Sequence, residues 1–190
     1  KDISYINKKF EIEKIISFKG IKQGIENTNY LLRSKNKRFI LTIFEKRVSQ
    51  NEIPFFMKLM DQLNNSKINC PKPQKNKNGN YLVRIRKKSA CIVSFLEGKD
   101  KKLLNLKNCH EIGKMIAGMH LSTKKINLFR KNSMGIKYLN PLLNSIKFKS
   151  KKFTNIEKFL KINFKDIKMK WPKKLPNGII HGDLFIDNIF

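Results

Sequence analysis

The apolar residues of this 190-residue chain change their spacing at Glu97 and Gly98. Before this point, short apolar stretches alternate with turn-forming residues, which is typical of β-strands. After it, apolar residues recur every three to four positions, which is typical of helices. The chain therefore predicts an α+β fold with a sheet-rich lobe over residues 1–96 and a helix-rich lobe over residues 97–190. The expected strands are 14–18, 30–33, 38–44, 81–85 and 90–95.

Helical spacing marks three regions. Pro54 opens the first, because proline is well tolerated in the first turn of a helix. Asn108 and Glu111 have the spacing of a capping box and open the second. A short apolar stretch at 178–180 instead predicts a strand that leads into His181. The helical regions are 54–63, 108–119 and, with one or two amphipathic helices, 144–169.

The net charge of +28 raises the question of nucleic acid. Of the 42 basic residues, 36 are Lys and 6 are Arg, and they are spread along the whole chain. Base readout and bidentate phosphate contacts favour Arg, so we interpret the Lys residues as solvated faces of a Lys-, Asn- and Ile-rich chain. A basic nucleic-acid-binding module is kept as an alternative. The charge can also concentrate a phosphorylated ligand near the surface.

The cysteines favour a reduced, cytoplasmic setting. Their number is odd, and Cys70, Cys91 and Cys109 form no C-x-x-C motif. No apolar run approaches the length of about 20 residues that a membrane-spanning helix needs, and no secretory signal is visible. The three histidines lack metal-ligand spacing, so we do not expect a zinc site.

The sharpest motif is HGDLFIDN at residues 181–188, which has the form H-x-D-x-x-x-x-N. Loops of this form carry out phosphoryl transfer in enzymes of the protein-kinase fold. Asp183 would face the acceptor hydroxyl and take its proton, and Asn188 would face a metal ion that bridges the phosphates. His181 would brace the loop through hydrogen bonds. The alternative is a surface loop with a capping aspartate.

Two further segments are compatible with nucleotide binding. The stretch 20–29 lies between the first two expected strands, and Gly20 and Gly24 would allow backbone N–H groups to approach phosphates. An ordinary hairpin loop explains this stretch equally simply. Residues 94–98 lie between the lobes and can present backbone groups to an adenine edge, or can be only a linker.

Taken together, these stretches resemble bacterial homoserine kinases of the type built on the aminoglycoside phosphotransferase and choline kinase fold. The resemblance runs in order over nearly the whole chain, which makes it more specific than any one motif. The stretches are FKGI at 18–21, GIENTN at 24–29, LTIFEKRV at 41–48, PFF at 54–56, CPKP at 70–73, FLEG at 95–98, MHL at 119–121 and HGDLFIDN at 181–188.

The resemblance implies a two-lobed, protein-kinase-like fold, ATP and Mg²⁺, and phosphorylation of the side-chain hydroxyl of L-homoserine to O-phospho-L-homoserine, a step toward threonine. Asp183 and His181 would be catalytic and Asn188 a magnesium ligand. The other implied nucleotide-binding residues are Gly20, Gly24 and Asn27 in the phosphate-covering loop, and Phe95 and Leu96 in the hinge at the adenine.

Two features depart from this pattern. Thr42 stands where kinases of this fold carry a Lys or Arg that holds the phosphates, which leaves Lys46 or Arg47 as the candidate cation. The chain also reaches only Phe190, before the expected second metal-binding Asp, so we expect the helical lobe to be incomplete and residues 1–190 alone not to catalyse. A kinase of the same fold that acts on choline, an aminoglycoside or a sugar is the main alternative, and a catalytically dead binding domain is another. The partner is expected to be a small molecule, with no membrane and no specific nucleic acid.

Overall fold

The computed structural model describes residues 2–22, 27–45, 49–99, 103–146 and 154–189. They divide into two compact units, of which the first comprises residues 1–129 with 178–190 and the second residues 130–177. The predicted lobe boundary between residues 96 and 97 remains a prediction. No helix of the described part is both long enough and apolar enough to cross a membrane.

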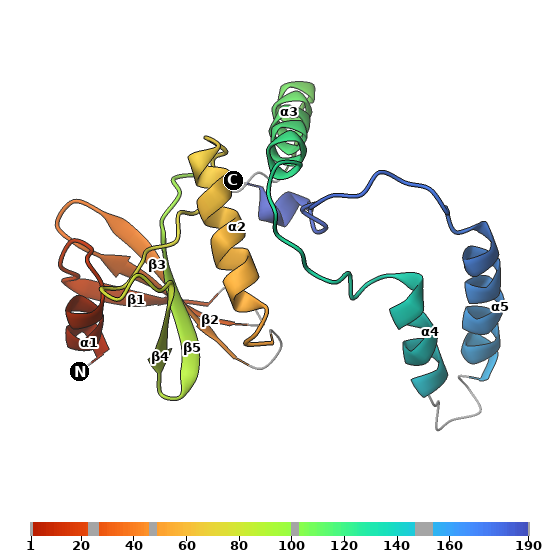
Figure 1. Cartoon of the computed structure of the whole chain (residues 1–190), viewed down its shortest axis with the longest axis horizontal. Coiled ribbons are helices and arrows are strands. Elements are labelled where there is room, and N and C mark those ends of the chain that lie inside the picture. The colour runs from red at the N-terminus through yellow and green to blue at the C-terminus, as the bar shows by residue number, and fades with distance from the viewer. Residues whose placement is uncertain (1, 23–26, 46–48, 100–102, 147–153, 190) are drawn as a thin grey trace. The chain divides into compact units, whose positions relative to one another are not determined.

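The first unit is built on a five-stranded antiparallel sheet with the order β1-β2-β3-β5-β4 (Figure 1). Five strands were predicted for residues 1–96, the α+β class agrees with the prediction, and the strand predicted at 38–44 has those bounds. The strands are β1 (Ser17–Ile21), β2 (Asn27–Arg33), β3 (Arg38–Phe44), β4 (Leu82–Ile85) and β5 (Lys88–Ser94).

Helices α1 (Asp2–Lys9) and α2 (Ile53–Asn65) lie on opposite sides of this sheet (Figure 1). Successive residues of a strand point to opposite faces, and β5 shows the consequence. Ile92 is fully buried in the cluster that contains Ile6 of α1, whereas its neighbour Cys91 is buried in the cluster that contains Met57 of α2. The sheet therefore has an α1 face and an α2 face, each with its own core.

One helix of the first strand region was missed, and one predicted strand was mostly wrong. Helix α1 was not predicted, because its few apolar residues acquire a partner only when the sheet has formed. The apolar stretch predicted as a strand at 14–18 is mostly not one, since pairing begins at Ser17. Ile15 is instead buried against α1, where Asn7 both donates to its carbonyl at 3.0 Å and accepts from its N–H at 2.8 Å.

Helix α3 (Leu106–Thr123) begins earlier than predicted. Its capping box is formed by Asn105 and Asn108, with Asn105 Oδ1 accepting from the Asn108 N–H at 2.9 Å, and not by Asn108 and Glu111. The strand predicted at 178–180 was also wrong: these residues pair with no strand of the described part, and Ile180 is 67% exposed.

The second unit contains α4 (Ile136–Ser145) and α5 (Thr154–Lys170). The prediction of one or two helices over 144–169 is confirmed for α5, whereas α4 begins earlier than that region. The remaining element is a short 3₁₀ helix, η2 (Ile186–Asn188), which belongs to the first unit.

Candidate active site

The loop 181–188 brings Asp183 and Asn188 together. Gly182 has a φ of +76°, a left-handed conformation that side-chain-bearing residues rarely adopt, and η2 then turns the chain back. As a result, the Asn188 Nδ2 donates to the Asp183 carbonyl at 2.8 Å and to its carboxylate Oδ2 at 3.2 Å. These are the two residues of the motif that were predicted to act in one site.

This contact decides which atoms of the pair remain for a ligand. The amide nitrogen of Asn188 is directed at Asp183, so the amide oxygen is the atom that can face a cation. Hard cations such as Mg²⁺ prefer oxygen ligands, and the donor type therefore fits. Both side chains are exposed to solvent, so an acceptor molecule can reach the carboxylate.

The bracing role of His181 stays a prediction. This residue is exposed, and no hydrogen bond joins its side chain to another residue of the described part. Its catalytic role also stays a prediction. The loop is held by the backbone of Gly182 and by the side chain of Asn188.

The α2 face of the sheet carries an apolar row across its three central strands. Leu31 lies opposite Ile40, and Ile40 lies opposite Val93. Directly opposed residues in antiparallel strands share one face, and Val93 contacts the cluster beneath α2. All three side chains are only half-buried, in contrast to the fully buried residues of the α1 face. The three side chains form a partly open apolar surface, and Val93 lies one residue before the end of β5.

The segment after β5, predicted as the hinge, is anchored by Arg38 at the start of β3. The Phe95 N–H donates to the Arg38 carbonyl at 3.1 Å, and the guanidinium lies 4.4 Å from the Phe95 ring centroid. Arg38 also forms an ion pair with Glu97. The Phe95 N–H is thus engaged, whereas the Leu96 N–H has no backbone partner among the described residues. The backbone N–H of the exposed Leu96 is therefore a donor that a ligand can reach.

A polar pair lies one row further along the α2 face. Asn29 and Thr42 are directly opposed, and the Thr42 hydroxyl donates to the Asn29 Oδ1 at 2.8 Å. The same row continues through Cys91, which is covered by α2. Thr42 is the residue at which a phosphate-holding cation was expected and not found. Sequence reasoning missed Asn29 as its partner, because only the register of β2 and β3 brings the two together.

The loop between β1 and β2 is shorter than predicted, since Gly20 belongs to β1 and Asn27 to β2. A Cβ on Gly20 would lie 3.9 Å from Cε1 of Tyr30, which is ordinary contact, so the fold itself does not require glycine there. Asn27 is half-buried opposite Phe44. The predicted residues Gly24 and Lys46 lie outside the described residues.

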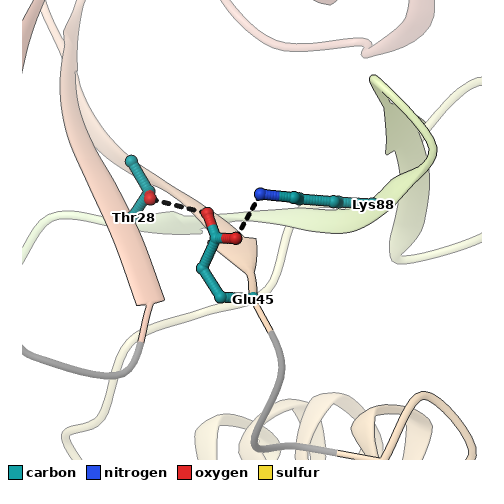
Figure 2. Close-up of polar contacts among 3 residues, drawn as sticks. All are labelled: Thr28, Glu45 and Lys88. Atoms are coloured by element: carbon teal, nitrogen blue, oxygen red, sulfur yellow. Dashed lines mark hydrogen bonds and ion pairs between the residues drawn. The ribbon is translucent and has the colours of Figure 1, made fainter.

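A second polar cluster lies on the α1 face and was not predicted (Figure 2). The Thr28 hydroxyl donates to Glu45 Oε1 at 2.8 Å, and Glu45 forms an ion pair with Lys88 at the start of β5. Thr28 lies opposite Ile43, whose side chain packs on the α1-face core. The Lys88 charge is therefore compensated by Glu45 on the side of the sheet opposite to Thr42.

Two of the thiols, those of Cys91 and Cys70, are unsuited to nucleophilic chemistry. Burial raises the pKa of Cys91 to about 12, against a smaller lowering effect of a hydrogen bond from the Thr42 backbone. Burial also raises the pKa of Cys70. Among the described residues, no group of three or more His, Cys, Asp or Glu side chains could hold a metal ion.

Two cavities of the first unit lie away from these residues. The larger, of about 650 Å³, is lined by residues of α1, the 76–80 turn and β4, and the smaller, of about 130 Å³, lies on the α1 face. Neither is lined by residues 94–98 or 181–188. The candidate site is thus defined by the loop and the α2-face rows and not by an enclosed cavity.

Curated relatives cover nearly all of the chain. It is 36% identical over 186 residues to the homoserine kinase of Parvibaculum lavamentivorans, which covers 95% of the chain and 57% of that protein. It is 37% identical over 182 residues to that of Paramagnetospirillum magneticum, covering 95% and 56%, and 34% identical over all 190 residues to that of a Rhodopseudomonas palustris strain, covering 100% and 58%. The chain thus spans a little over half the length of these relatives.

Solved structures of low sequence identity share the fold. The amicoumacin kinase hAmiN, in complex with AMP-PNP, Ca²⁺ and Ami, matches with a TM-score of 0.71 at 15% identity and covers 96% of this chain and 57% of its own. The spectinomycin phosphotransferase APH(9)-Ia, in complex with ADP and spectinomycin, matches with a TM-score of 0.62 at 12% identity, covering 98% and 63%. The model of the phosphotransferase enzyme family, APH, matches residues 17–190. This match includes the sheet, the polar and apolar rows and the Asp183 loop, and the chain belongs to the phosphotransferase enzyme family.

Proposed function

We propose that the full-length protein transfers the γ-phosphoryl group of ATP to the side-chain hydroxyl of L-homoserine, which yields O-phospho-L-homoserine for threonine biosynthesis. The observation that carries the substrate is the identity of about 35% to homoserine kinases over at least 95% of the chain. The reaction type rests on the family and on the contact between Asp183 and Asn188.

Asp183 is the residue that would act on the acceptor. Its carboxylate is exposed and can accept a hydrogen bond from the homoserine hydroxyl, orient it toward the γ-phosphorus and take its proton as the O–P bond forms. The hydrogen bond from Asn188 holds the carboxylate in place without protonating it. Orientation matters here because phosphoryl transfer depends mainly on positioning and charge stabilisation.

The nucleotide would lie along the α2 face of the sheet. The half-buried row of Leu31, Ile40 and Val93 offers an apolar surface for the adenine, and the Leu96 N–H offers a donor to its edge. Phe95 would contribute its ring and carbonyl, since its N–H is bonded to Arg38. The phosphates would then point toward the β1–β2 loop, where Gly20, Gly24 and Asn27 are the proposed contacts, with Lys46 as the proposed cation.

Mg²⁺ is the cation that we propose for this site. When bound, it would neutralise charge on the phosphates. Asn188 would contribute its amide oxygen, which faces away from the contact with Asp183. Most of the coordination would come from phosphate oxygens, water and residues other than those described, as is usual for Mg²⁺. We also propose a cytoplasmic location, which the three cysteines, free of disulfides, favour.

An ADP-release assay on the full-length protein tests this function. L-Homoserine, L-serine, choline and a sugar alcohol are offered with ATP and MgCl₂. We expect turnover with L-homoserine alone. Asp183→Asn keeps the size of the side chain and its acceptor oxygen but removes the base, so kcat should fall roughly 10²- to 10⁴-fold.

Asp166→Asn is the matched control, since Asp166 lies in α5 and, among the described residues, forms only an exposed ion pair with Lys170. Its kcat should equal that of the parent protein. Turnover with choline or the sugar alcohol in place of homoserine would show a different kinase of the same fold. No turnover with any acceptor would refute the proposal.

A further inference from the structure

Among the described residues, the row of Asn29, Thr42 and Cys91 on the α2 face, where the phosphates of a nucleotide would end, contains no cation. We propose that the hydrogen-bonded pair of Asn29 and Thr42 binds phosphate oxygens there, with the Asn29 Nδ2 group as the donor. The inference rests on the proposed function, since it assumes that the α2 face holds the nucleotide.

The register places the pair correctly relative to the apolar row. Asn29 precedes Leu31 by two residues in β2, and Thr42 follows Ile40 by two residues in β3, so the polar row lies about 7 Å further along the strands. If the adenine of a nucleotide packs on the apolar row, the phosphates of the nucleotide can lie near the polar row. Asn29 is also only three residues from the end of the 23–26 segment of the β1–β2 loop.

The hydrogen bond from Thr42 determines which group of the Asn29 side chain is available to a ligand. The Thr42 hydroxyl donates to Oδ1, so the amide is fixed with its oxygen toward Thr42 and its two N–H donors directed elsewhere. No described residue accepts a hydrogen bond from this Nδ2 group, and both side chains are half-buried and not closed off. A fixed amide with unoccupied donors is suited to a phosphate oxygen.

Two cations of this sheet, Lys88 and Arg38, are already paired, whereas Lys19 lies opposite Leu31 on the α2 face, one row before the pair of Asn29 and Thr42. Lys88 is paired with Glu45 on the α1 face, and Arg38 is paired with Glu97 beside the hinge. The contact from Asn29 would add to any contact from Lys46, which is a separate part of the proposed site. The phosphate would thus meet a neutral amide at the position where related folds place a charge.

Nucleotide binding to the full-length protein separates this role from a structural one. Asn29→Asp keeps the size of the side chain and the acceptor for Thr42 but replaces the two donors with a carboxylate that repels phosphate. Binding of ADP, measured by calorimetry with MgCl₂, should weaken roughly 10- to 100-fold, the range of a hydrogen bond to a charged group. Binding of adenosine, which has no phosphate, should stay within about twofold of the parent value.

Asn80→Asp is the matched control, because it adds the same charge at an exposed turn outside the two rows. Its ADP affinity should equal that of the parent. An Asn29→Asp protein that binds ADP as tightly as the parent, or that loses ADP and adenosine equally, overturns the inference. A parent protein that binds neither ligand refutes the proposed nucleotide site itself, whereas normal ADP results without homoserine turnover refute only the proposed acceptor.

Discussion

At the scale of the residue, the loop 181–188 depends on one backbone conformation. Gly182 has a φ of +76°, and the turn that follows lets Asn188 reach back to Asp183. A Cβ at Gly182 would meet no heavy atom within 4 Å, so any cost of a side chain there comes from the backbone alone. For a residue with a Cβ, the left-handed conformation costs about 1–2 kcal/mol.

The matched pair Gly182→Ala and Gly178→Ala tests this dependence. Gly178 has equally open surroundings but no left-handed φ, so its substitution should leave turnover unchanged. Gly182→Ala should lower kcat roughly 5- to 30-fold, because the strained loop populates its bound conformation less often. The measurement is kcat on the full-length protein beside its affinity for ADP, which should not change. Equal kcat values for the two variants would show that the loop does not need the left-handed turn.

At the scale of the element, the docking of α2 closes one half of the α2 face and leaves the other half open. Met57 and Ile53 cover Cys91, which is only 2% exposed, whereas Thr42, next to Cys91 in the same row, is half-buried. The edge of α2 therefore determines where a ligand surface can begin. Cys91 reports on this docking, because its thiol is reachable only when α2 moves away.

Thiol labelling makes this docking measurable. With a pKa of about 12, about one Cys91 thiol in ten thousand is ionised at pH 8, so Cys91 should resist iodoacetamide while the exposed Cys109 reacts. At pH values below this pKa, each increase of one pH unit raises the thiolate fraction about tenfold. Cys91 should therefore react faster with iodoacetamide as the pH is raised. Mass spectrometry of the digested protein locates the label.

Met57→Ala should accelerate labelling of Cys91, because the cavity left by a 3% exposed methionine destabilises the core by about 2–5 kcal/mol. Met169→Ala, at a side chain 67% exposed, is the control and should change nothing. If Cys91 of the parent protein reacts as fast as Cys109, α2 does not cover this row in solution.

At the scale of the whole molecule, the charge is unbalanced. With 42 basic and 14 acidic side chains, at least 28 cations have no acidic partner of their own (42 − 14 = 28). Repulsion among these positive charges destabilises the folded state, and dissolved salt screens the repulsion. The ion pairs of the described part, such as Arg38 with Glu97, are largely exposed and compensate little of the repulsion.

Thermal unfolding of the full-length protein should respond to salt accordingly. Between about 0.01 M and 0.1 M NaCl the screening length falls from about 30 Å to about 10 Å. We expect Tm to rise by roughly 2–5 °C, which corresponds to about 1 kcal/mol. NaF should give the same rise as NaCl if screening and not a specific ion is responsible. A Tm that falls over this range would contradict net repulsion.

Local sequence patterns were sufficient to predict much of the secondary structure. The apolar run and the turn before it predicted β3 with its observed bounds, and Pro54 predicted α2 within one or two residues at each end. The spacing of Asp183 and Asn188 predicted that the two side chains lie together, because a contact across five residues is local. Patterns failed where an apolar stretch found no strand partner: Ile15 packs on α1, and Ile180 has no strand beside it among the described residues.

Local sequence patterns were therefore enough to predict the α+β class, the bounds of β3 and the proximity of Asp183 and Asn188, since hydrophobic period, turn residues and short spacings act over a few residues. Only the tertiary structure decided that Asn29 lies against Thr42, that Arg38 anchors Phe95 and that Glu45 compensates Lys88. These contacts depend on strand register and strand order, which are set by burial of the whole sheet against α1 and α2. A shift of one residue in that register would move each of these side chains to the other face.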